Sequence, residues 1–372
     1  MNVSPLQTRD YLTRWAFGLA AGTLLVWGTS PWFVRSYHSR VFDPVCHDWV
    51  YPASTQYRWR SEGYATTTIG VHGMPGRTNL PPSTTERVIA LWGDSQAEGV
   101  CVADSDKLWS QLESEIAGSK NASFAVLPMA RSGEDALDWT SRFARVEKQL
   151  GVTEHFVLIC ELEDLESLAE SQSNADSNAL AEAAIPGRTD IDVPVESLSV
   201  NAVPQWLDLV PDFVVHAARG LIFDGDTSQI RTLRFRPGPV ASTAVTQSTQ
   251  TSATVDPNQP PEAFPASVIA RRLADATTNP ITMIYAPQIP VVMGDRIIRS
   301  DAHDSQFRML EAALAEQGIT VIDCRDGLWG AAAQGHFPHG FNNGRIGSGH
   351  LNETGYRVIA AQVGAKAGSN SR

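Results

Sequence analysis

A short polar stretch directly follows an apolar run near the end of the first quarter of the chain, and its residues could perform chemistry. The run "RVIALW" ends at Trp92, and the stretch "GDSQAEG" follows with Gly93, Asp94 and Ser95. A serine hydroxyl is a weak nucleophile unless a base lies within hydrogen-bond reach and donors stabilise the oxyanion that forms. Gly-Asp-Ser is also typical of a tight turn or a helix cap. Catalysis at Ser95 therefore requires a base from elsewhere in the chain.

A candidate base lies near the C-terminal end of the sequence. His350 stands in "GSGHLNETGY", directly before a segment that we expect to be helical from Asn352 or Glu353. A glycine-rich loop at the start of a helix can present a histidine as a general base. The alternative is a solvent-facing loop histidine without a catalytic role. Ser95 and His350 form a nucleophile–base pair only if the fold brings them together.

The segments around these residues alternate between predicted strands and predicted helices. The predicted strands are "RVIALW", "ASFAVLPMA", "HFVLIC", "ITMIYAPQIPVV" and "GITVIDC", the fourth of which runs into a loop. The predicted helices cover 108–116, 135–150, 305–317 and 352–365. Such alternation indicates a parallel sheet with helices on both faces. The functional loops of these sheets lie at the carboxyl ends of the strands, where Ser95 is found. We therefore predict an α/β domain with a mainly five-stranded parallel sheet.

The sequence divides into regions of different composition. We predict a tail and apolar segment at 1–35, an extended lead-in at 36–86, an α/β domain formed by 87–170 and 266–366, and an insertion at 171–265. The insertion contains "ASTAVTQSTQTSATVDPNQPPEAF", whose Ser, Thr, Gln and Pro cannot build an apolar core. We therefore predict a long central insertion that is partly of low complexity.

The apolar segment near the N-terminus has the length of a membrane span. Residues 15–34, "WAFGLAAGTLLVWGTSPWFV", carry no charge, and about 20 apolar residues cross a bilayer as a helix. A cleaved signal peptide would need a small-residue site after this run, and none follows. Gly18, Gly22, Gly28 and Pro31 suit a buried helix of a soluble protein poorly. We therefore predict an uncleaved transmembrane anchor, with the bulk of the chain outside the cytoplasm, in the periplasm or at the cell surface.

Charge and cysteine usage exclude some functions. The chain of 372 residues has a formal net charge of -12 and no Lys/Arg run, so we do not expect it to bind nucleic acid. Its four cysteines lack the spacing of a metal site. We expect Cys160 and Cys324 to be buried free thiols, whereas a disulfide between Cys46 and Cys101 is left open. No cofactor is expected.

A metal hydrolase is a further alternative. The segments "DAHDSQF" near Asp301 and "GHFPHGF" around His336 and His339 contain histidine and aspartate, but not at a recognised ligand spacing. Both histidines could line a pocket or lie exposed in a loop; we expect the loop, and we expect no metal.

The serine and histidine blocks together resemble the SGNH (GDSL) hydrolases, which are serine esterases and acyltransferases on a flavodoxin-like sheet. "GDSQAEG" is similar to the first block of that family, "HLNETGY" to its last block, and the order along the chain agrees. The lead-in "EGYATTTIGVHGMPGR" and the segment "GVCVADSDKLW" resemble those of anchored members. The resemblance runs from about Glu62 to Ala365 without the insertion. It implies Ser95 as nucleophile, His350 as base, Asp94 as a supporting residue and a three-layer α/β/α fold.

The middle blocks of the family agree less well with this chain. In "ARSGEDALDW", Gly133 occupies the position of the second-block glycine, which implies that its backbone N–H and that of Ser95 form the oxyanion hole; a turn glycine is the alternative. The third block, Gly-x-Asn-Asp, reads "ELED". Asp164 matches its aspartate, but Glu163 replaces the asparagine. An ionised glutamate cannot donate a hydrogen bond to an oxyanion.

The acid that should orient the histidine is also missing from its usual position. The family places an aspartate three residues before the histidine, and that position is Gly347 here. A carboxylate elsewhere, a backbone carbonyl or a Ser–His dyad could replace it. Because the third and last loops converge in such folds, Glu163 is the candidate for a displaced acid.

These residues lead to two functional hypotheses. The first is a membrane-anchored serine hydrolase or O-acyltransferase that acts on an acylated small molecule or an extracytoplasmic glycan. The second is a non-catalytic glycan-binding or scaffold module that keeps the fold without turnover. Sugar stacking on Trp92, Trp109 or Trp139 would serve the second, although core packing is the alternative for each.

Overall fold

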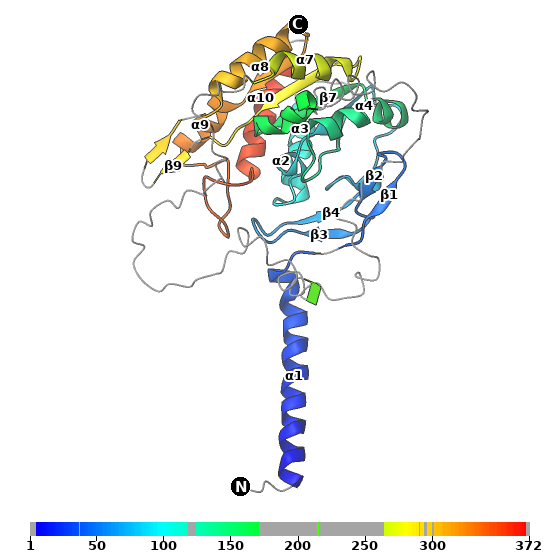
Figure 1. Cartoon of the computed structure of the whole chain (residues 1–372), viewed down its shortest axis with the longest axis vertical. Coiled ribbons are helices and arrows are strands. Elements are labelled where there is room, and N and C mark those ends of the chain that lie inside the picture. The colour runs from blue at the N-terminus through cyan, green and yellow to red at the C-terminus, as the bar shows by residue number, and fades with distance from the viewer. Residues whose placement is uncertain are drawn as a thin grey trace, which may run out of the picture.

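A five-stranded parallel sheet forms the centre of the molecule. The computed structural model describes residues 5–36, 38–117, 124–170, 214–215, 264–289, 291–293, 296–299 and 301–369 (Figure 1). The sheet has the order β11-β8-β7-β5-β6, and every neighbouring pair is parallel. Its strands are β5 (Arg87–Trp92), β6 (Phe124–Pro128), β7 (Glu154–Ile159), β8 (Ile281–Tyr285) and β11 (Thr320–Asp323). Numbered along the chain, the order is 2-1-3-4-5, which is that of flavodoxin-like sheets.

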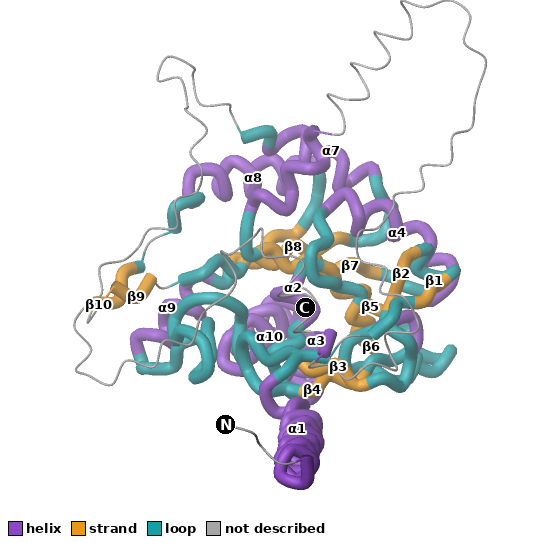
Figure 2. The backbone as a smooth tube through the Cα atoms, turned by 60° about the horizontal axis from the view of Figure 1, so that its bottom comes forward, coloured by secondary structure: helices purple, strands orange, loops and turns teal. Residues whose placement is uncertain are grey.

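Helices cover both faces of this sheet. One face packs against α4 (Ala136–Leu150), α7 (Ala266–Asp275) and α8 (Asp304–Glu316); the other packs against α2 (Ser95–Glu98), α3 (Leu108–Ala117), α9 (Arg325–Ala333) and α10 (Glu353–Ser369) (Figure 2). Side chains of a strand alternate between its two faces. In β5, Ala90 and Trp92 enter the first core, whereas Ile89 and Leu91 enter the second. The α/β class and the five-stranded parallel sheet are therefore confirmed.

Some elements differ from the sequence-based expectation. The fourth strand ends at Tyr285 and runs into a loop, and the small hairpin of β9 (Val291–Met293) and β10 (Arg296–Ile298) that follows was not predicted. Helices α7 and α9 were not predicted, although Ile269, Ala270 and Leu273 give α7 a helical apolar spacing. Three short 3₁₀ helices, η1 (Val71–Gly73), η2 (Asp104–Asp106) and η3 (Leu162–Leu165), connect the larger elements. Most of the predicted insertion, 171–265, lies outside the described residues.

The lead-in consists of two small antiparallel hairpins against the main domain. They are formed by β1 (Val41–Asp43) with β2 (Asp48–Val50), and by β3 (Gln56–Arg58) with β4 (Thr66–Thr68). Tyr57 and Ile69 from the second hairpin region share a small buried cluster with Val100 and Cys101, which directly follow α2. The lead-in therefore packs beside the segment that carries Ser95.

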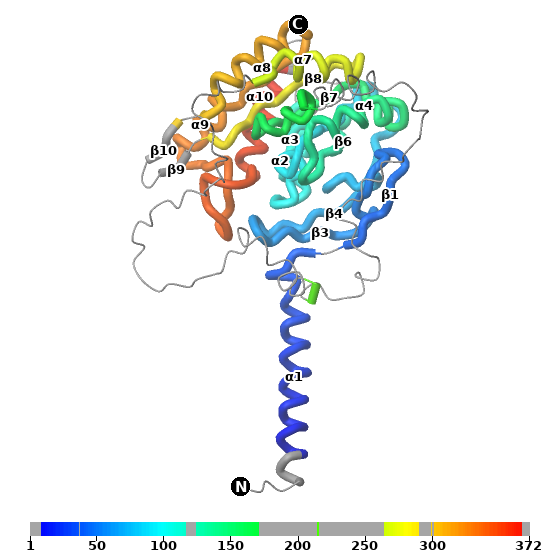
Figure 3. Tube along the Cα trace, in the orientation of Figure 1, coloured from blue at the N-terminus to red at the C-terminus, as the bar shows by residue number. Residues whose placement is uncertain are grey.

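The predicted membrane span requires a correction. The apolar run does form a helix, α1 (Pro5–Phe33), which projects away from the sheet domain (Figure 3). Many of its apolar side chains are exposed. Within the described ranges, however, no helix combines the length and the hydropathy that crossing a membrane requires. The Gly, Thr, Ser and Trp residues of the run dilute its hydropathy. The transmembrane assignment of residues 15–34 is therefore not confirmed.

All four cysteines are buried free thiols. This confirms the expectation for Cys160 and Cys324. The pairing that the sequence left open between Cys46 and Cys101 is not formed.

Lys107 connects the lead-in to the loop after α2. Its side chain is completely buried, and Nζ donates to Thr67 Oγ1 at 3.0 Å, to the Val102 carbonyl at 3.3 Å and to the Gly99 carbonyl. Burial lowers the pKa of Lys107 to about 8, so most molecules still carry the ammonium charge at neutral pH. The buried ammonium group of Lys107 thus bonds to one acceptor in the lead-in, Thr67, and to two in the loop after α2, Gly99 and Val102.

Removal of this donor should destabilise the protein. Lys107→Met keeps the apolar stem but leaves the three acceptors without their partner, so we expect the free energy of unfolding to fall by about 3 kcal/mol. Urea denaturation measures this change. Lys148→Met, on the exposed side of α4, is the control and should stay within about 0.5 kcal/mol of the wild type. Equal stability of both variants would contradict a linking role for Lys107.

Candidate active site

A sharp turn between β5 and α2 presents Ser95 at the carboxyl end of the sheet. Gly93 has a φ of +145°, and a Cβ atom there would lie 2.7 Å from Ala97 Cβ and 2.9 Å from the Leu158 carbonyl oxygen. Only glycine fits this turn. Asp94 then caps α2, because its Oδ1 accepts a hydrogen bond from the Gln96 amide at 2.9 Å. Ser95 is consequently the first residue of α2.

The structure brings His350 to Ser95. The serine Oγ and His350 Nε2 are 3.0 Å apart, although 255 residues separate them in sequence. Two contacts from α2 hold the histidine loop and α10 in place: the Leu351 amide donates to Gln96 Oε1 at 2.8 Å, and the Tyr356 hydroxyl donates to the Gln96 carbonyl at 2.6 Å. The nucleophile–base contact that Ser95 requires is therefore present.

The acid beside the histidine is Glu62, not Glu163. Glu62 Oε2 accepts from His350 Nδ1 at 2.6 Å and from the His350 backbone amide at 3.1 Å. Glu163 instead lies with its carboxylate 3.7 Å from His303 Nε2, and its side chain is 57% exposed. In the structure, Glu62 from the lead-in therefore occupies the place beside His350 that we predicted for Glu163. Gly347, at the family's usual acid position, has a φ of +79° and forms a turn.

Two glycines allow the close backbone packing around this acid. Gly349 has a φ of +97°, and a Cβ atom there would lie 2.5 Å from Glu62 Oε1. Gly63 donates its amide to Asn343 Oδ1 at 2.8 Å, and a Cβ atom at Gly63 would lie 2.1 Å from the Cys101 carbonyl oxygen. The close packing of these backbones fixes Glu62 in its place. One sequence signal was available: Glu62 is the only acidic residue between Asp48 and Glu86.

The surroundings of His350 favour its charged form. Burial disfavours the imidazolium, but the hydrogen bond and charge of Glu62, together with the charges of Asp94 and Glu98, outweigh burial and raise the pKa of His350 above its ordinary value. Because a carboxylate can only accept, the neutral ring carries its proton on Nδ1 and leaves Nε2 as acceptor for the Ser95 hydroxyl. This arrangement suits a base that must take a proton from the serine and hold it.

Two backbone amides are candidates for oxyanion donors. Gly133 lies in the loop between β6 and α4 with a φ of +83°, and no atom lies within 4 Å of the position a Cβ would take. As far as the structure describes the chain, neither the Gly133 amide nor the Ser95 amide donates to a protein acceptor. Both donors are therefore available to a substrate. The role of the Gly133 amide as an oxyanion donor, which the resemblance implies, stays a proposal.

The third-block loop contributes carboxyl groups where the family has an amide donor. Burial, together with the negative charges of Asp94, Glu161 and Glu163, raises the pKa of Asp164 to about 7. Burial and the charge of Asp94 likewise raise the pKa of Glu161. Burial also raises the pKa of Asp94 itself. This side of the site therefore supplies negative charge and protonatable carboxyls rather than an asparagine amide.

The candidate metal ligands do not come together. His336 is exposed, whereas His339 is buried, which corrects the expectation that both lie exposed in a loop. His339 Nδ1 lies 3.3 Å from the Gly349 carbonyl, and burial lowers the pKa of His339 to about 4. Asp301 accepts from Arg325 and Tyr285. His339 thus contacts the loop that carries His350.

One other group in the described part of the chain could offer metal ligands. The ligand atoms of Glu62, Cys101 and His350 lie within 4.8 Å of one another. Because Glu62 and His350 already bond to each other in line with Ser95, we assign them to that arrangement.

The tryptophans proposed for sugar stacking belong to the core or its margin. Trp92 and Trp139 are completely buried, and Trp109 donates Nε1 to the Pro75 carbonyl at 3.1 Å. Their faces pack against protein, so the structure gives the binding-module hypothesis no stacking platform at these three positions.

Comparisons with known proteins leave the family open. No family model and no curated protein matches the sequence. Among solved structures, the crystal structure of LAE5, an alpha/beta hydrolase enzyme from the metagenome of Lake Arreo, Spain, is similar to 77% of this chain and 96% of its own, with 12% identity and a TM-score of 0.37. Because a similarity this weak carries no functional weight, we derive the function from the geometry of the site.

Replacement of Glu62 should slow catalysis strongly. Glu62→Gln keeps the shape but removes the charge that stabilises the imidazolium, so we expect turnover of an ester substrate to fall roughly 10²- to 10⁴-fold. Glu163→Gln is the matched comparison and should keep turnover within about threefold of the wild type, a change worth well under 1 kcal/mol. The reverse ranking of the two variants would restore Glu163 as the acid.

The pH profile should shift in a defined direction. The base works only when His350 is neutral, so kcat/KM rises with pH through the raised pKa of His350. Removal of the Glu62 charge lowers that pKa, so the acid limb of Glu62→Gln should move to lower pH while its plateau falls. An unmoved limb in a pH–rate measurement would contradict electrostatic control by Glu62.

Proposed function

We propose that this protein is a serine hydrolase that cleaves carboxylic esters through Ser95, His350 and Glu62. One observation carries the proposal: Ser95 Oγ, His350 and Glu62 form a continuous hydrogen-bonded series of 3.0 Å and 2.6 Å at the carboxyl end of the sheet. A nucleophile, a base and a group that orients the base are the parts that acyl transfer requires.

The chemistry follows from the roles of these atoms. Ser95 Oγ attacks the ester carbonyl carbon while His350 Nε2 takes the hydroxyl proton, and Glu62 stabilises the imidazolium. The Ser95 and Gly133 amides donate to the oxyanion of the tetrahedral intermediate. His350 then gives its proton to the leaving alkoxide, and an acyl-serine remains. A second hydroxyl compound, activated by His350, attacks the acyl-serine and releases Ser95.

The finer parts of the proposal concern family and acceptor. Membership in the SGNH hydrolases is supported by the blocks around Ser95 and His350 and by the sheet order, but Glu163 and Gly347 depart from the family pattern. Water as acceptor makes an esterase, and a sugar hydroxyl makes an O-acyltransferase. Action on an acylated glycan stays a prediction by analogy.

The second hypothesis, a non-catalytic module, loses part of its support. It depended on the altered residues at two expected catalytic positions, Glu163 and Gly347. Glu62 occupies the acid's place beside His350, whereas Glu163 still stands where an asparagine donor is expected. Attachment to a membrane through residues 15–34 and a location outside the cytoplasm stay predictions. The exposed apolar side chains of α1 support attachment to an apolar surface.

Substitution of the nucleophile tests the proposal directly. Ser95→Ala removes the attacking oxygen, so we expect hydrolysis of p-nitrophenyl acetate to fall by at least about 10³-fold. A fluorophosphonate probe should label the wild type at Ser95 and leave Ser95→Ala unlabelled. Ser141→Ala, an exposed serine of α4, is the control and should keep both labelling and turnover. Labelling that persists in Ser95→Ala would refute this nucleophile.

A further inference from the structure

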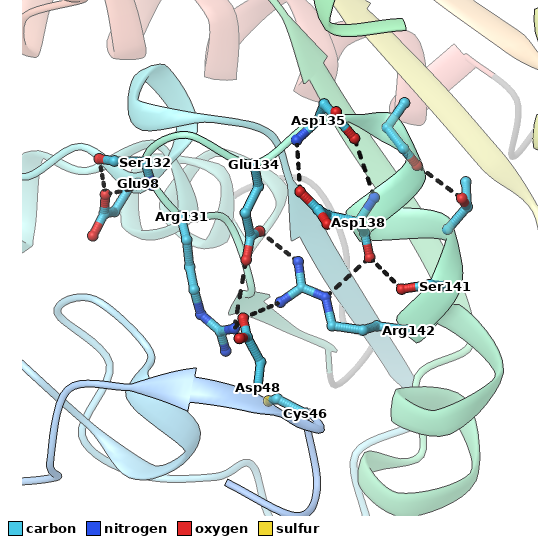
Figure 4. A network of polar contacts seen from close by, with 12 residues as sticks. Cys46, Asp48, Glu98, Arg131, Ser132, Glu134, Asp135, Asp138, Ser141 and Arg142 are labelled. Carbon is cyan, nitrogen blue, oxygen red and sulfur yellow. Dashed lines mark hydrogen bonds and ion pairs between the residues drawn. The ribbon is translucent and has the colours of Figure 1, made fainter. Parts of the chain in front are cut away.

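We propose that Glu98 is a positioning residue that fixes the Gly133 amide by holding Ser132, an inference that rests on the proposed function. Glu98 is the last residue of α2, the helix that begins with Ser95, and its side chain is buried. Its Oε2 accepts from the Ser132 backbone amide at 2.9 Å and from the Ser132 hydroxyl (Figure 4). The nucleophile helix is thereby bonded to the residue that directly precedes Gly133.

This contact relates the two candidate oxyanion donors to each other. Ser95 begins α2 and Glu98 ends it, so the two lie about one helical turn apart on one rigid unit. Ser132 and Gly133 are solvent-exposed, and Gly133 has open space around it. Glu98 therefore sets where the Gly133 amide lies relative to the Ser95 amide, without touching a substrate itself.

The residues on either side of Ser132 and Gly133 are held by a separate ionic network. Arg131 Nη1 lies 2.5 Å from Asp48 Oδ2 and 3.5 Å from Glu134 Oε1, and Arg142 pairs with Glu134 (Figure 4). Asp48 belongs to β2 of the lead-in. This network fixes both ends of the loop, whereas the two residues at its exposed tip depend on Glu98.

The chemistry of the contact calls for a carboxylate. The Ser132 amide and hydroxyl both donate, and an ionised carboxylate is a side chain that only accepts. A glutamine at this position has one acceptor oxygen and brings an NH₂ group that must find its own acceptors. Glu98→Gln should therefore weaken the bond to Ser132 while it keeps the size of the side chain.

A comparison of ground-state and transition-state binding tests this role. For Glu98→Gln we expect kcat for p-nitrophenyl acetate to fall roughly 10- to 100-fold, with KM within about twofold of the wild type, because a misplaced donor affects only the oxyanion. Affinity for a trifluoromethyl ketone, which forms an oxyanion on the serine, should fall by the same factor as kcat/KM. Rates are taken on the pH plateau, because the charge of Glu98 also contributes to the raised pKa of His350.

Two further variants separate positioning from general stability. Glu147→Gln is the matched control: Glu147 of α4 accepts from His155 Nε2 at 2.9 Å and from Thr277, away from Ser95. It should lower the thermal midpoint about as much as Glu98→Gln and leave kcat within about twofold. Ser132→Ala keeps the backbone amide bond and loses only the hydroxyl bond, so its kcat should fall by less than that of Glu98→Gln. This variant carries the test if Glu98→Gln does not fold.

Two results overturn the inference, and they differ in what else they affect. If the wild type hydrolyses esters but Glu98→Gln keeps the wild-type kcat, the positioning role alone is overturned. The same holds if Glu147→Gln loses as much kcat as Glu98→Gln. A wild type that neither hydrolyses esters nor labels at Ser95 overturns the proposed function and this inference with it.

Discussion

The hydrogen bond between Glu62 and His350 is the interaction on which the candidate site depends. It holds the proton on Nδ1, and therefore leaves Nε2 facing the Ser95 hydroxyl as an acceptor. Both partners are largely buried, with 18% of the Glu62 side chain and 25% of the His350 side chain exposed, so the interaction is screened less than it would be in water. Because Glu62 belongs to the lead-in, that segment is part of the site and not a linker.

The short helix α2 organises the remaining parts. Within four residues, Ser95 faces the histidine, Gln96 holds the backbone of the histidine loop, and Glu98 holds the loop of Gly133. Two of these contacts join α2 to the loop that precedes α10, and the third joins it to the loop between β6 and α4. The turn at Gly-Asp-Ser therefore presents the nucleophile, and the α2 residues that follow it connect the surrounding loops.

Negative charge dominates the neighbourhood of Ser95 and has two opposite effects. The charges of Glu62, Asp94 and Glu98 favour an imidazolium at His350. The same charges, together with the third-block carboxyls, disfavour an oxyanion. Glu163 in the position of the family's asparagine supplies no compensating donor. In the proposed mechanism, the backbone amides of Ser95 and Gly133 would have to provide that stabilisation.

The sequence by itself determined the local elements, the α/β class and two members of the site. Apolar periodicity and the Gly-Asp-Ser stretch depend on neighbouring residues, so strands, most helices, Ser95 and His350 could be recognised without a structure. Helices α7 and α9 were not predicted, because short apolar patterns are ambiguous. We predicted a membrane span from the apolar run of α1, although its Gly, Thr, Ser and Trp residues dilute its hydropathy. Only the tertiary structure identified Glu62, which lies 288 residues from His350 and replaces the predicted Glu163. Glu62 contacts His350 because distant backbone segments pack closely at Gly63 and Gly349. A local sequence pattern cannot predict that packing.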